Sequence, residues 1–174
     1  MDDVLDILKL GVEKERLRGA AYAQAAAQTH HALARATFTA LAEQEAAHER
    51  YLQAYYDKQV ANEGWPAPDE MGVSADMRDT IRTIFAQATA QIAQAGAADA
   101  GLTEVYEAGI AAERESVEFY ADALSKATDP NAKAFFATLV KAEKMHLKLL
   151  SETQEFLDDT GKWFFDEEQW IVEG

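Results

Sequence analysis

The feature that most constrains the fold of this 174-residue chain is an internal repeat. When the sequence is shifted by 98 positions, residues 11–52 align without a gap on residues 109–150, and thirteen of the 42 aligned pairs are identical. Four of these pairs are alanines, which recur by chance in an alanine-rich chain. The others include Glu, His, Tyr and Phe, and their coincidence at one offset indicates a duplication. We therefore expect two similar halves related by an approximate twofold axis.

The hydrophobic pattern is helical in both halves, and it breaks where proline, glycine or a capping residue stands. Ser74 and Asp129 are the expected N-caps of two helices, and Pro130 suits a first helical position. The sequence predicts helices over about 3–28, 32–62, 75–94, 100–127 and 130–158. We expect one domain spanning 1–174: hairpin 1 (about 3–62), a crossover with a connecting helix (63–99), hairpin 2 (100–158) and an aromatic tail (159–174). This arrangement is an all-α four-helix bundle with a long crossover.

Composition narrows the functions open to the chain. It has no cysteine, so disulfides, thiolate metal sites and a cysteine nucleophile are excluded, and any bound metal needs nitrogen and oxygen ligands. A formal net charge of −15 argues against nucleic acid and anionic membranes as partners. The sequence has no apolar run near the roughly 20 residues of a membrane span, and the acidic N-terminus does not resemble a secretory or transit peptide. The expected location is cytoplasmic.

Each half carries one lone glutamate and, thirty residues later, the motif Glu-x-x-His. Residues three apart lie on one face of a helix, so each motif can present two ligands to one site. A single Glu-x-x-His is a common surface pair, but two in register after matched glutamates indicate a metal site. The predicted metal ligands are Glu15, Glu45, His48, Glu113, Glu143 and His146.

The ligand candidates stand within the apolar faces of their helices. Leu41 precedes Glu45 by four residues, and Leu52 follows His48 by four. A glutamate in an apolar face is costly unless it is paired or bound to a cation. Two divalent ions would balance four carboxylates. We expect Glu45 and Glu143 to bridge the two ions, with one Glu–His pair (Glu15 with His48, Glu113 with His146) completing each position.

Two further repeat-related pairs lie near the predicted ligands. Tyr22 and Tyr120 stand two turns beyond the lone glutamates, where they could donate to ligand carboxylates, act as local reductants or simply fill the core. Gly11 and Gly109 stand one turn before the same glutamates. They either leave room for a small oxidant or let the helices approach closely, and we favour close packing.

The Glu15–Tyr22, Leu41–His48, Glu113–Tyr120 and Glu143–His146 stretches resemble the rubrerythrin-like branch of the ferritin-like superfamily, and the aromatic, acidic tail 163–170 is similar to the endings of stand-alone members. The resemblance covers essentially the whole chain. It implies a ferritin-like bundle, a cofactor of two iron ions, reaction with hydrogen peroxide or dioxygen in oxidative stress, and a homodimer that sometimes exchanges helices. Iron–iron, manganese–iron and manganese–manganese pairs all suit the ligands.

The sequence departs from this family in two respects. It has no cysteine for a rubredoxin domain, so the electrons would come from a separate donor protein. The family's additional ligand glutamate falls at Ser116, and the matching position of the first helix is Arg18. Its absence moves the site from efficient peroxide reduction toward the six-ligand pattern of ferroxidase centres, unless a register change recruits Glu115 or Glu118.

Three functions remain open on the sequence alone. The first is a non-haem di-iron oxidoreductase that reduces hydrogen peroxide or dioxygen with outside electrons. The second is a ferroxidase or iron-handling protein, which would consume many Fe(II) ions per chain. The third is a non-catalytic helical interaction module that docks a partner through the aromatic residues of the tail: Trp163, Phe164, Phe165 and Trp170.

Overall fold

The computed structural model describes residues 4–73, 77, 79–84 and 101–158, and these residues form helices and loops without a strand. The four long helices are α1 (Val4–Gln28), α2 (Ala32–Val60), α4 (Leu102–Lys126) and α5 (Pro130–Asp158). Their ends lie within two residues of the predicted ones, and the predicted all-α bundle is confirmed. Of the predicted connecting helix, residues 79–84 are described and helical. Ser74 and the aromatic tail lie outside the described residues.

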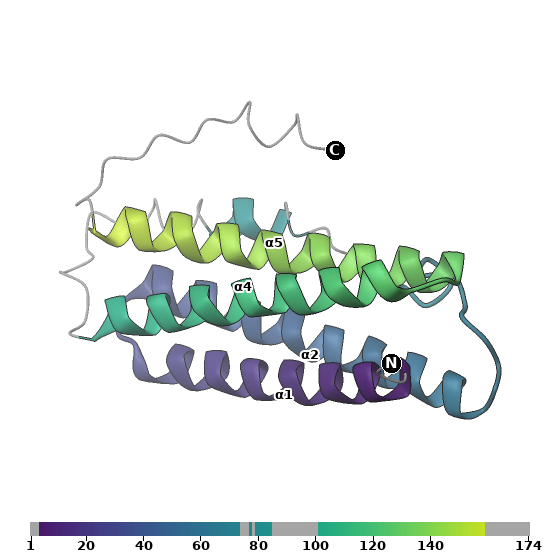
Figure 1. Cartoon of the computed structure of the whole chain (residues 1–174). Coiled ribbons are helices and arrows are strands. Elements are labelled where there is room, and N and C mark those ends of the chain that lie inside the picture. The colour runs from purple at the N-terminus through teal and green to yellow at the C-terminus, as the bar shows by residue number, and fades with distance from the viewer. Residues whose placement is uncertain (1–3, 74–76, 78, 85–100, 159–174) are drawn as a thin grey trace.

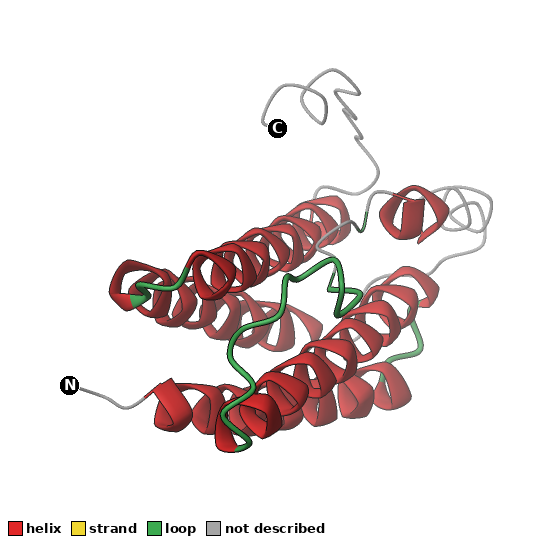
Figure 2. Ribbon diagram, turned by 90° about the vertical axis from the view of Figure 1, so that its right-hand side faces the viewer, coloured by secondary structure: helices red, strands yellow, loops and turns green. Residues whose placement is uncertain are grey.

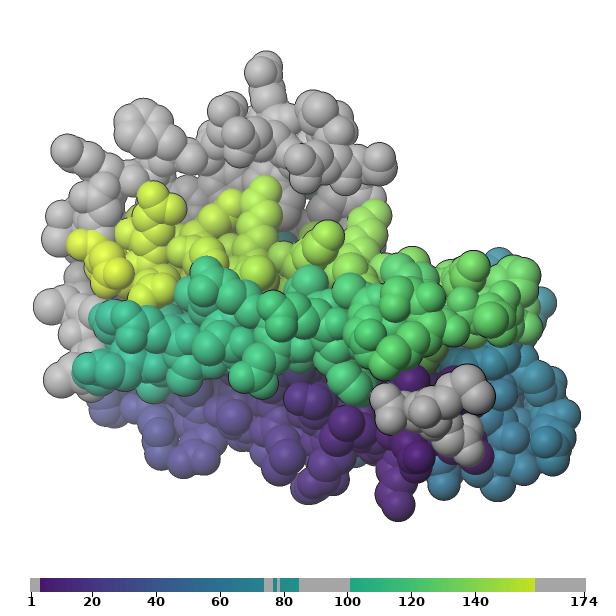
Figure 3. Space-filling view, viewed as in Figure 1, coloured from purple at the N-terminus to yellow at the C-terminus, as the bar shows by residue number. Residues whose placement is uncertain are grey.

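The helices pack as two hairpins laid against each other. α1 pairs with α2, and α4 pairs with α5 (Figure 1). Between the hairpins, α2 contacts α5 and α1 contacts α4. Figure 2 shows the same bundle turned by 90° from Figure 1. The space-filling view shows α1 and α4 closed against each other along one face (Figure 3). None of the described helices has the length and apolar character needed to cross a membrane.

The start of α5 is fixed as the sequence predicts. The Asp129 carboxylate accepts hydrogen bonds from the backbone N–H groups of Asn131 (2.8 Å) and Ala132 (3.1 Å). These donors have no partner inside the helix, so the side chain satisfies them as an N-cap. The register of α5, and with it the position of Glu143 and His146, is thereby set from its first turn.

The first part of the crossover is held to one end of the bundle. Its Trp65 ring packs against Tyr55 and Phe135, with ring centroids 5.4 and 6.2 Å apart. The Asn131 side chain donates to the Trp65 carbonyl oxygen over 2.8 Å, and the Tyr55 hydroxyl donates to that of Pro66 over 3.1 Å. The chain leaves α2 through Gly64, whose φ of 77° suits glycine. These contacts tie the two hairpins together where the chain itself connects them.

Two apolar clusters fill the bundle, one toward each end. One contains Tyr22, Phe38 and Tyr106, and residues of the crossover such as Met77 pack into it. The other contains Leu8 and Tyr120. Along α1, Glu15 therefore lies midway between a residue of one cluster and a residue of the other. The polar residues of the predicted site sit at the middle of the bundle, with apolar packing on both sides.

The two repeat-related glycines are explained by packing. A Cβ atom on Gly11 would lie 3.1 Å from Leu52 and 3.4 Å from the Tyr120 hydroxyl, and one on Gly109 would lie 3.3 Å from Leu150 and 3.4 Å from the Tyr22 ring. The space beside each glycine is thus already filled by a leucine and a tyrosine. The favoured interpretation, close packing rather than room for an oxidant, is the one this geometry supports.

Gly11→Val should therefore destabilise the protein by about 1–3 kcal/mol, because a three-carbon side chain must displace Leu52 and Tyr120 in a filled core. Chemical denaturation of the metal-free protein measures this change. Ala21→Val, at an exposed position of the same helix, is the matched control and should cost less than about 1 kcal/mol. Equal losses in the two variants would contradict the packing explanation.

Candidate metal centre

The structure brings all six predicted ligands to one place at the middle of the bundle. Each helix contributes through its inward face: one glutamate from α1 and one from α4, and a Glu–His pair from α2 and from α5. All four glutamates are 0% exposed, and His48 and His146 are 1% and 0% exposed. Glutamate is almost never buried to this degree unless it has a charged partner. This arrangement demands a cation.

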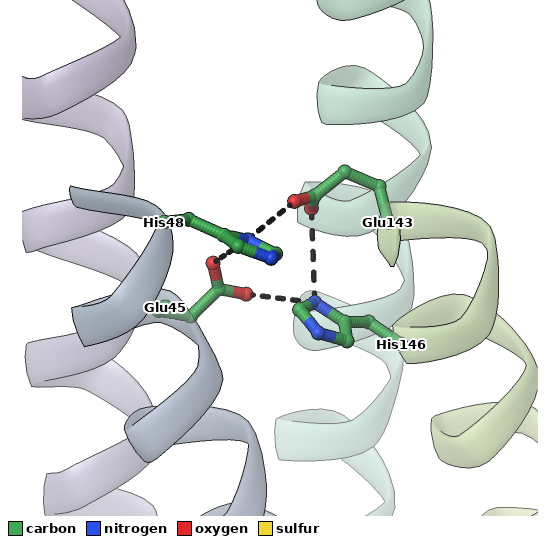
Figure 4. Close-up of side chains that lie close together, drawn as sticks. All are labelled: Glu45, His48, Glu143 and His146. Atoms are coloured by element: carbon green, nitrogen blue, oxygen red, sulfur yellow. Dashed lines mark ion pairs between the residues drawn. The ribbon is translucent and has the colours of Figure 1, made fainter. Parts of the chain in front are cut away.

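The two Glu-x-x-His motifs face each other across the bundle (Figure 4). His48 Nδ1 lies 3.0 Å from a Glu143 oxygen, and His146 Nδ1 lies 3.1 Å from a Glu45 oxygen. Each histidine thus points at the glutamate of the opposite motif, and the imidazole rings stack with centroids 5.2 Å apart. Ligand atoms of these four residues all lie within 4.8 Å of one another.

The lone glutamates complete the group with the expected symmetry. Glu15 Oε2 lies 3.7 Å from His48 Nδ1, and Glu113 Oε2 lies 3.7 Å from His146 Nδ1. The result is two terminal Glu–His pairs on either side of Glu45 and Glu143. The six predicted residues therefore lie together, while two bridged metal positions and the ligand role of each residue stay predictions.

Several buried polar atoms of this group make no hydrogen bond within the described part of the chain. They are both ring nitrogens of His48 and His146, both carboxylate oxygens of Glu143, and Oε2 of Glu113. Buried polar atoms normally have partners. Here nitrogens and oxygens approach within 3–4 Å but point past one another. Atoms so arranged suit a divalent cation with nitrogen and oxygen ligands, so the residues fit the metal site that the sequence predicts.

The two tyrosines hydrogen-bond to the terminal glutamates in a crossed pattern. The Tyr22 hydroxyl donates to Glu113 over 2.5 Å, and the Tyr120 hydroxyl donates to Glu15. Each tyrosine therefore supports the glutamate of the other hairpin, which the sequence alone does not reveal. Burial and the adjacent carboxylate raise the pKa of both hydroxyls above the usual range, so they remain protonated donors. Their proposed catalytic role remains a prediction.

Arg18 is the member of the site that sequence reasoning missed. Its side chain is about nine-tenths buried, and its guanidinium lies among the carboxylates. It contacts Glu15 at 2.5 Å and both Glu45 and Glu143 at 3.2 Å. It also donates to the Ser116 hydroxyl, which occupies the matching position in the repeat. A signal was present, since Arg18 shares the inward face of α1 with Glu15 three residues before it and Tyr22 four residues after it.

The position of the family's additional ligand contains no carboxylate in this structure. Ser116 is buried and bonded to Arg18, whereas Glu115 and Glu118 are exposed on α4. Neither glutamate is recruited to the site, so the carboxylates described there are the four predicted ones. The register change that the sequence left open does not occur in this structure.

Because the carboxylates lie close together, their pKa values differ from one another. Burial and the nearby Glu45 carboxylate raise the pKa of Glu15 and, more strongly, of Glu143. Burial also opposes ionisation of Glu45, but the adjacent His146 and Arg18 hold its pKa well below the usual range. Burial lowers the pKa of His146, yet Glu45 and Glu113 together raise it to about 10. Without a metal, the site therefore holds its charge balance with protons.

Part of the chain matches the model of a known protein family. The family model for rubrerythrin matches residues 71–153, which include all of α4 and most of α5. Over this segment, just under half of the chain, the protein is similar to rubrerythrin. No curated protein and no solved structure matches it. The matched segment contains Glu113, Glu143 and His146. The internal repeat extends the rubrerythrin-like pattern to Glu15, Glu45 and His48 in the half outside the match.

Removing either tyrosine hydroxyl should weaken the rubrerythrin-like bundle. Tyr22→Phe and Tyr120→Phe each leave a buried carboxylate oxygen without its donor, at a cost of about 1–3 kcal/mol. Denaturation of metal-free protein measures the loss. Tyr51→Phe is the matched control, because its hydroxyl bonds the Gly72 carbonyl oxygen at an exposed site where water can replace it. The control should change stability by less than about 0.5 kcal/mol, and equal effects would argue against the crossed hydrogen bonds.

The stability of the metal-free protein should fall as the pH rises. Protonated His146 stabilises the fold fully below its unfolded pKa of 6.5, and that contribution is lost as the pH approaches its folded pKa of about 10. Glu143, whose pKa is also raised, acts in the same direction. Thermal midpoints measured with a chelator between these pH values test this. His146→Gln should flatten the profile, and a wild-type profile that is already flat would contradict the assignment.

Proposed function

We propose that the chain is a non-haem di-iron oxidoreductase that reduces hydrogen peroxide or dioxygen with electrons from a separate donor. One observation carries the proposal. Four glutamates and two histidines, all at most 1% exposed, meet at the middle of the bundle, and the ring nitrogens of both histidines and three carboxylate oxygens of Glu113 and Glu143 make no hydrogen bond among the described residues. The rubrerythrin match, which covers three of the six residues, supports iron as the metal.

Each residue of the site has one role in this proposal: bridging the two ions, holding one ion, or hydrogen-bonding to a ligand. Glu45 and Glu143 lie between the two histidines and would bridge the ions, while the Glu15–His48 and Glu113–His146 pairs would hold one ion each. A bound iron pair supplies the redox chemistry. Tyr22 and Tyr120 donate to the terminal glutamates and so orient them and limit their basicity. Burial of all six side chains keeps bulk water from the site.

The proposal takes three further elements from the resemblance and the composition. They are a homodimeric assembly, a cytoplasmic location and a separate electron-donor protein, since the chain has no cysteine with which to hold a rubredoxin-type iron. On α1, Leu10 and Leu17 are 49% and 54% exposed and lie seven residues apart on one helix face. This face is suited to pack against a second copy of the chain.

Ferroxidase activity is the second candidate, and a specific observation favours it. The position of the family's additional ligand holds Ser116, and Glu115 and Glu118 point to solvent. The carboxylates that surround the site are therefore those of a six-ligand centre. A ferroxidase would oxidise Fe(II) at the site and pass the product on, so its substrate and its cofactor would be the same metal.

The first experiment measures metal per chain by plasma mass spectrometry after purification without added metal. We expect about two irons per chain, the number that four carboxylates and two imidazoles can bridge. The Glu45→Ala, Glu143→Ala double variant should hold none, because it lacks both central carboxylates. Absence of metal from wild-type protein, even after anaerobic loading with Fe(II), would overturn the proposal.

Kinetics then separate the two candidates. The reduced protein is mixed with peroxide or dioxygen, either with a chemical reductant or with excess Fe(II). Sustained reduction of the oxidant without net iron consumption supports the oxidoreductase. Consumption of many Fe(II) ions per chain supports the ferroxidase instead.

A further inference from the structure

The two halves of the candidate site match closely except at one position. The six ligand candidates, the two tyrosines and the two flanking glycines all recur at the offset of 98. Arg18 has Ser116 as its counterpart, and the two side chains contact each other near the twofold axis. An approximately symmetric site therefore contains one unsymmetrical charge.

Arg18 lies 3.2 Å from both central glutamates, Glu45 and Glu143, so its unequal contact with the two halves is at the terminal glutamates. Its guanidinium forks onto the central glutamate Glu45, with Nε 3.2 Å from Oε1 and Nη2 3.2 Å from Oε2. Nη2 also lies 2.5 Å from Oε2 of Glu15, the terminal glutamate on the same helix. Of the described carboxylates that pair with Arg18 at 4 Å or less, none is Glu113, the terminal glutamate of the other half. The Glu15 side of the site is already bonded to a cation.

The charge balance shows why this matters. Metal ligands bind in their deprotonated form, so the protons that balance the metal-free site leave as metal enters. Four carboxylates, two neutral histidines and one guanidinium then sum to −3, one divalent ion brings the total to −1, and a second brings it to +1. The first ion therefore leaves its ligands net negative, whereas the second overshoots neutrality in a buried environment where charges interact strongly. The second ion also has to share Glu15 with a guanidinium that remains charged at every relevant pH.

We propose that Arg18 makes the two metal positions unequal, so that a divalent ion binds first and more tightly at Glu113 and His146, and a second binds later and more weakly at Glu15 and His48. This inference rests on the proposed metal site and concerns its loading order. It makes Arg18 a positioning residue: it holds Glu15 and Glu45 in place before metal arrives and sets the affinity of the neighbouring position.

Metal binding by the metal-free protein tests the order directly. Co(II), added anaerobically and followed by its visible absorption and by equilibrium dialysis, reports both stoichiometry and affinity without any turnover. Wild-type protein should bind two ions per chain with dissociation constants that differ by at least about tenfold. Arg18→Ser copies the other half of the repeat, and its two constants should agree within about threefold, with the weaker site gaining the most.

Four further variants separate charge, position and general effects. Arg16→Ser removes an equal charge from an exposed pair with Glu13 and should behave like wild type. Arg18→Lys keeps the charge but not the fork, and should retain unequal sites. His146→Gln should remove the tighter ion, and His48→Gln the weaker one. Circular dichroism of each metal-free variant verifies that it folds, and the two histidine variants test the binding order if Arg18→Ser does not fold.

The outcomes distinguish this inference from the proposed function. Two equivalent ions in wild-type protein would overturn the inference and leave the two-metal site intact. Loss of the tighter ion in His48→Gln rather than in His146→Gln would overturn the assigned order. No binding in wild type but two ions in Arg18→Ser would overturn sequential loading in favour of complete exclusion by Arg18. No binding in either protein would overturn the proposed function together with the inference.

Discussion

Everything in this bundle depends on the burial of four carboxylates at its centre. Carboxylates so close together cannot all ionise unless cations stand among them. In the metal-free protein the compensation comes from the Arg18 guanidinium and from the raised pKa values of the two histidines, of Glu143 and of Glu15, all of which favour the protonated form. Two apolar clusters, one toward each end, keep water away and make these charges interact strongly. The apolar packing thus excludes water from the site, and the buried carboxylates in turn require a cation.

Duplication explains how a single chain assembles such a centre. One hairpin supplies a terminal glutamate and one Glu-x-x-His, which is half of the ligand set. The crossed hydrogen bonds of Tyr22 to Glu113 and Tyr120 to Glu15 then make each half incomplete without the other. Gly11 and Gly109 recur because each leaves space for the tyrosine that crosses from the opposite hairpin. These residues recur together in the repeat, and each of the contacts joins a residue of one hairpin to a residue of the other.

The sequence predicts the elements and the ligand candidates well because both depend on local spacing. Helix ends follow from capping residues such as Asp129, and Glu-x-x-His follows from the three-residue period of one face. Contacts between helices are harder to predict. Tyr22 and Glu15 lie on the same face of α1. The sequence of this helix alone therefore does not show that the Tyr22 hydroxyl donates a hydrogen bond to Glu113 on α4. Arg18, three residues after a glutamate, has the same spacing as the exposed Arg16–Glu13 pair, and its place on the inward face of α1 is the signal in the sequence that distinguishes it.

The asymmetry of the site extends beyond Arg18 itself. Gly19 lies against α2, where an added Cβ would stand 3.3 Å from Cβ of Glu45. The repeat has Val117 at the equivalent position of α4. A valine side chain in place of Gly19 would hold α1 away from α2 just where the guanidinium forks onto Glu45. The glycine therefore permits the close approach that Arg18 needs, and the two adjacent residues act together. In the other half, Ser116 requires no such approach, and Val117 is accommodated. Two neighbouring differences that support one contact indicate that the unequal halves are a built feature of this rubrerythrin-like site.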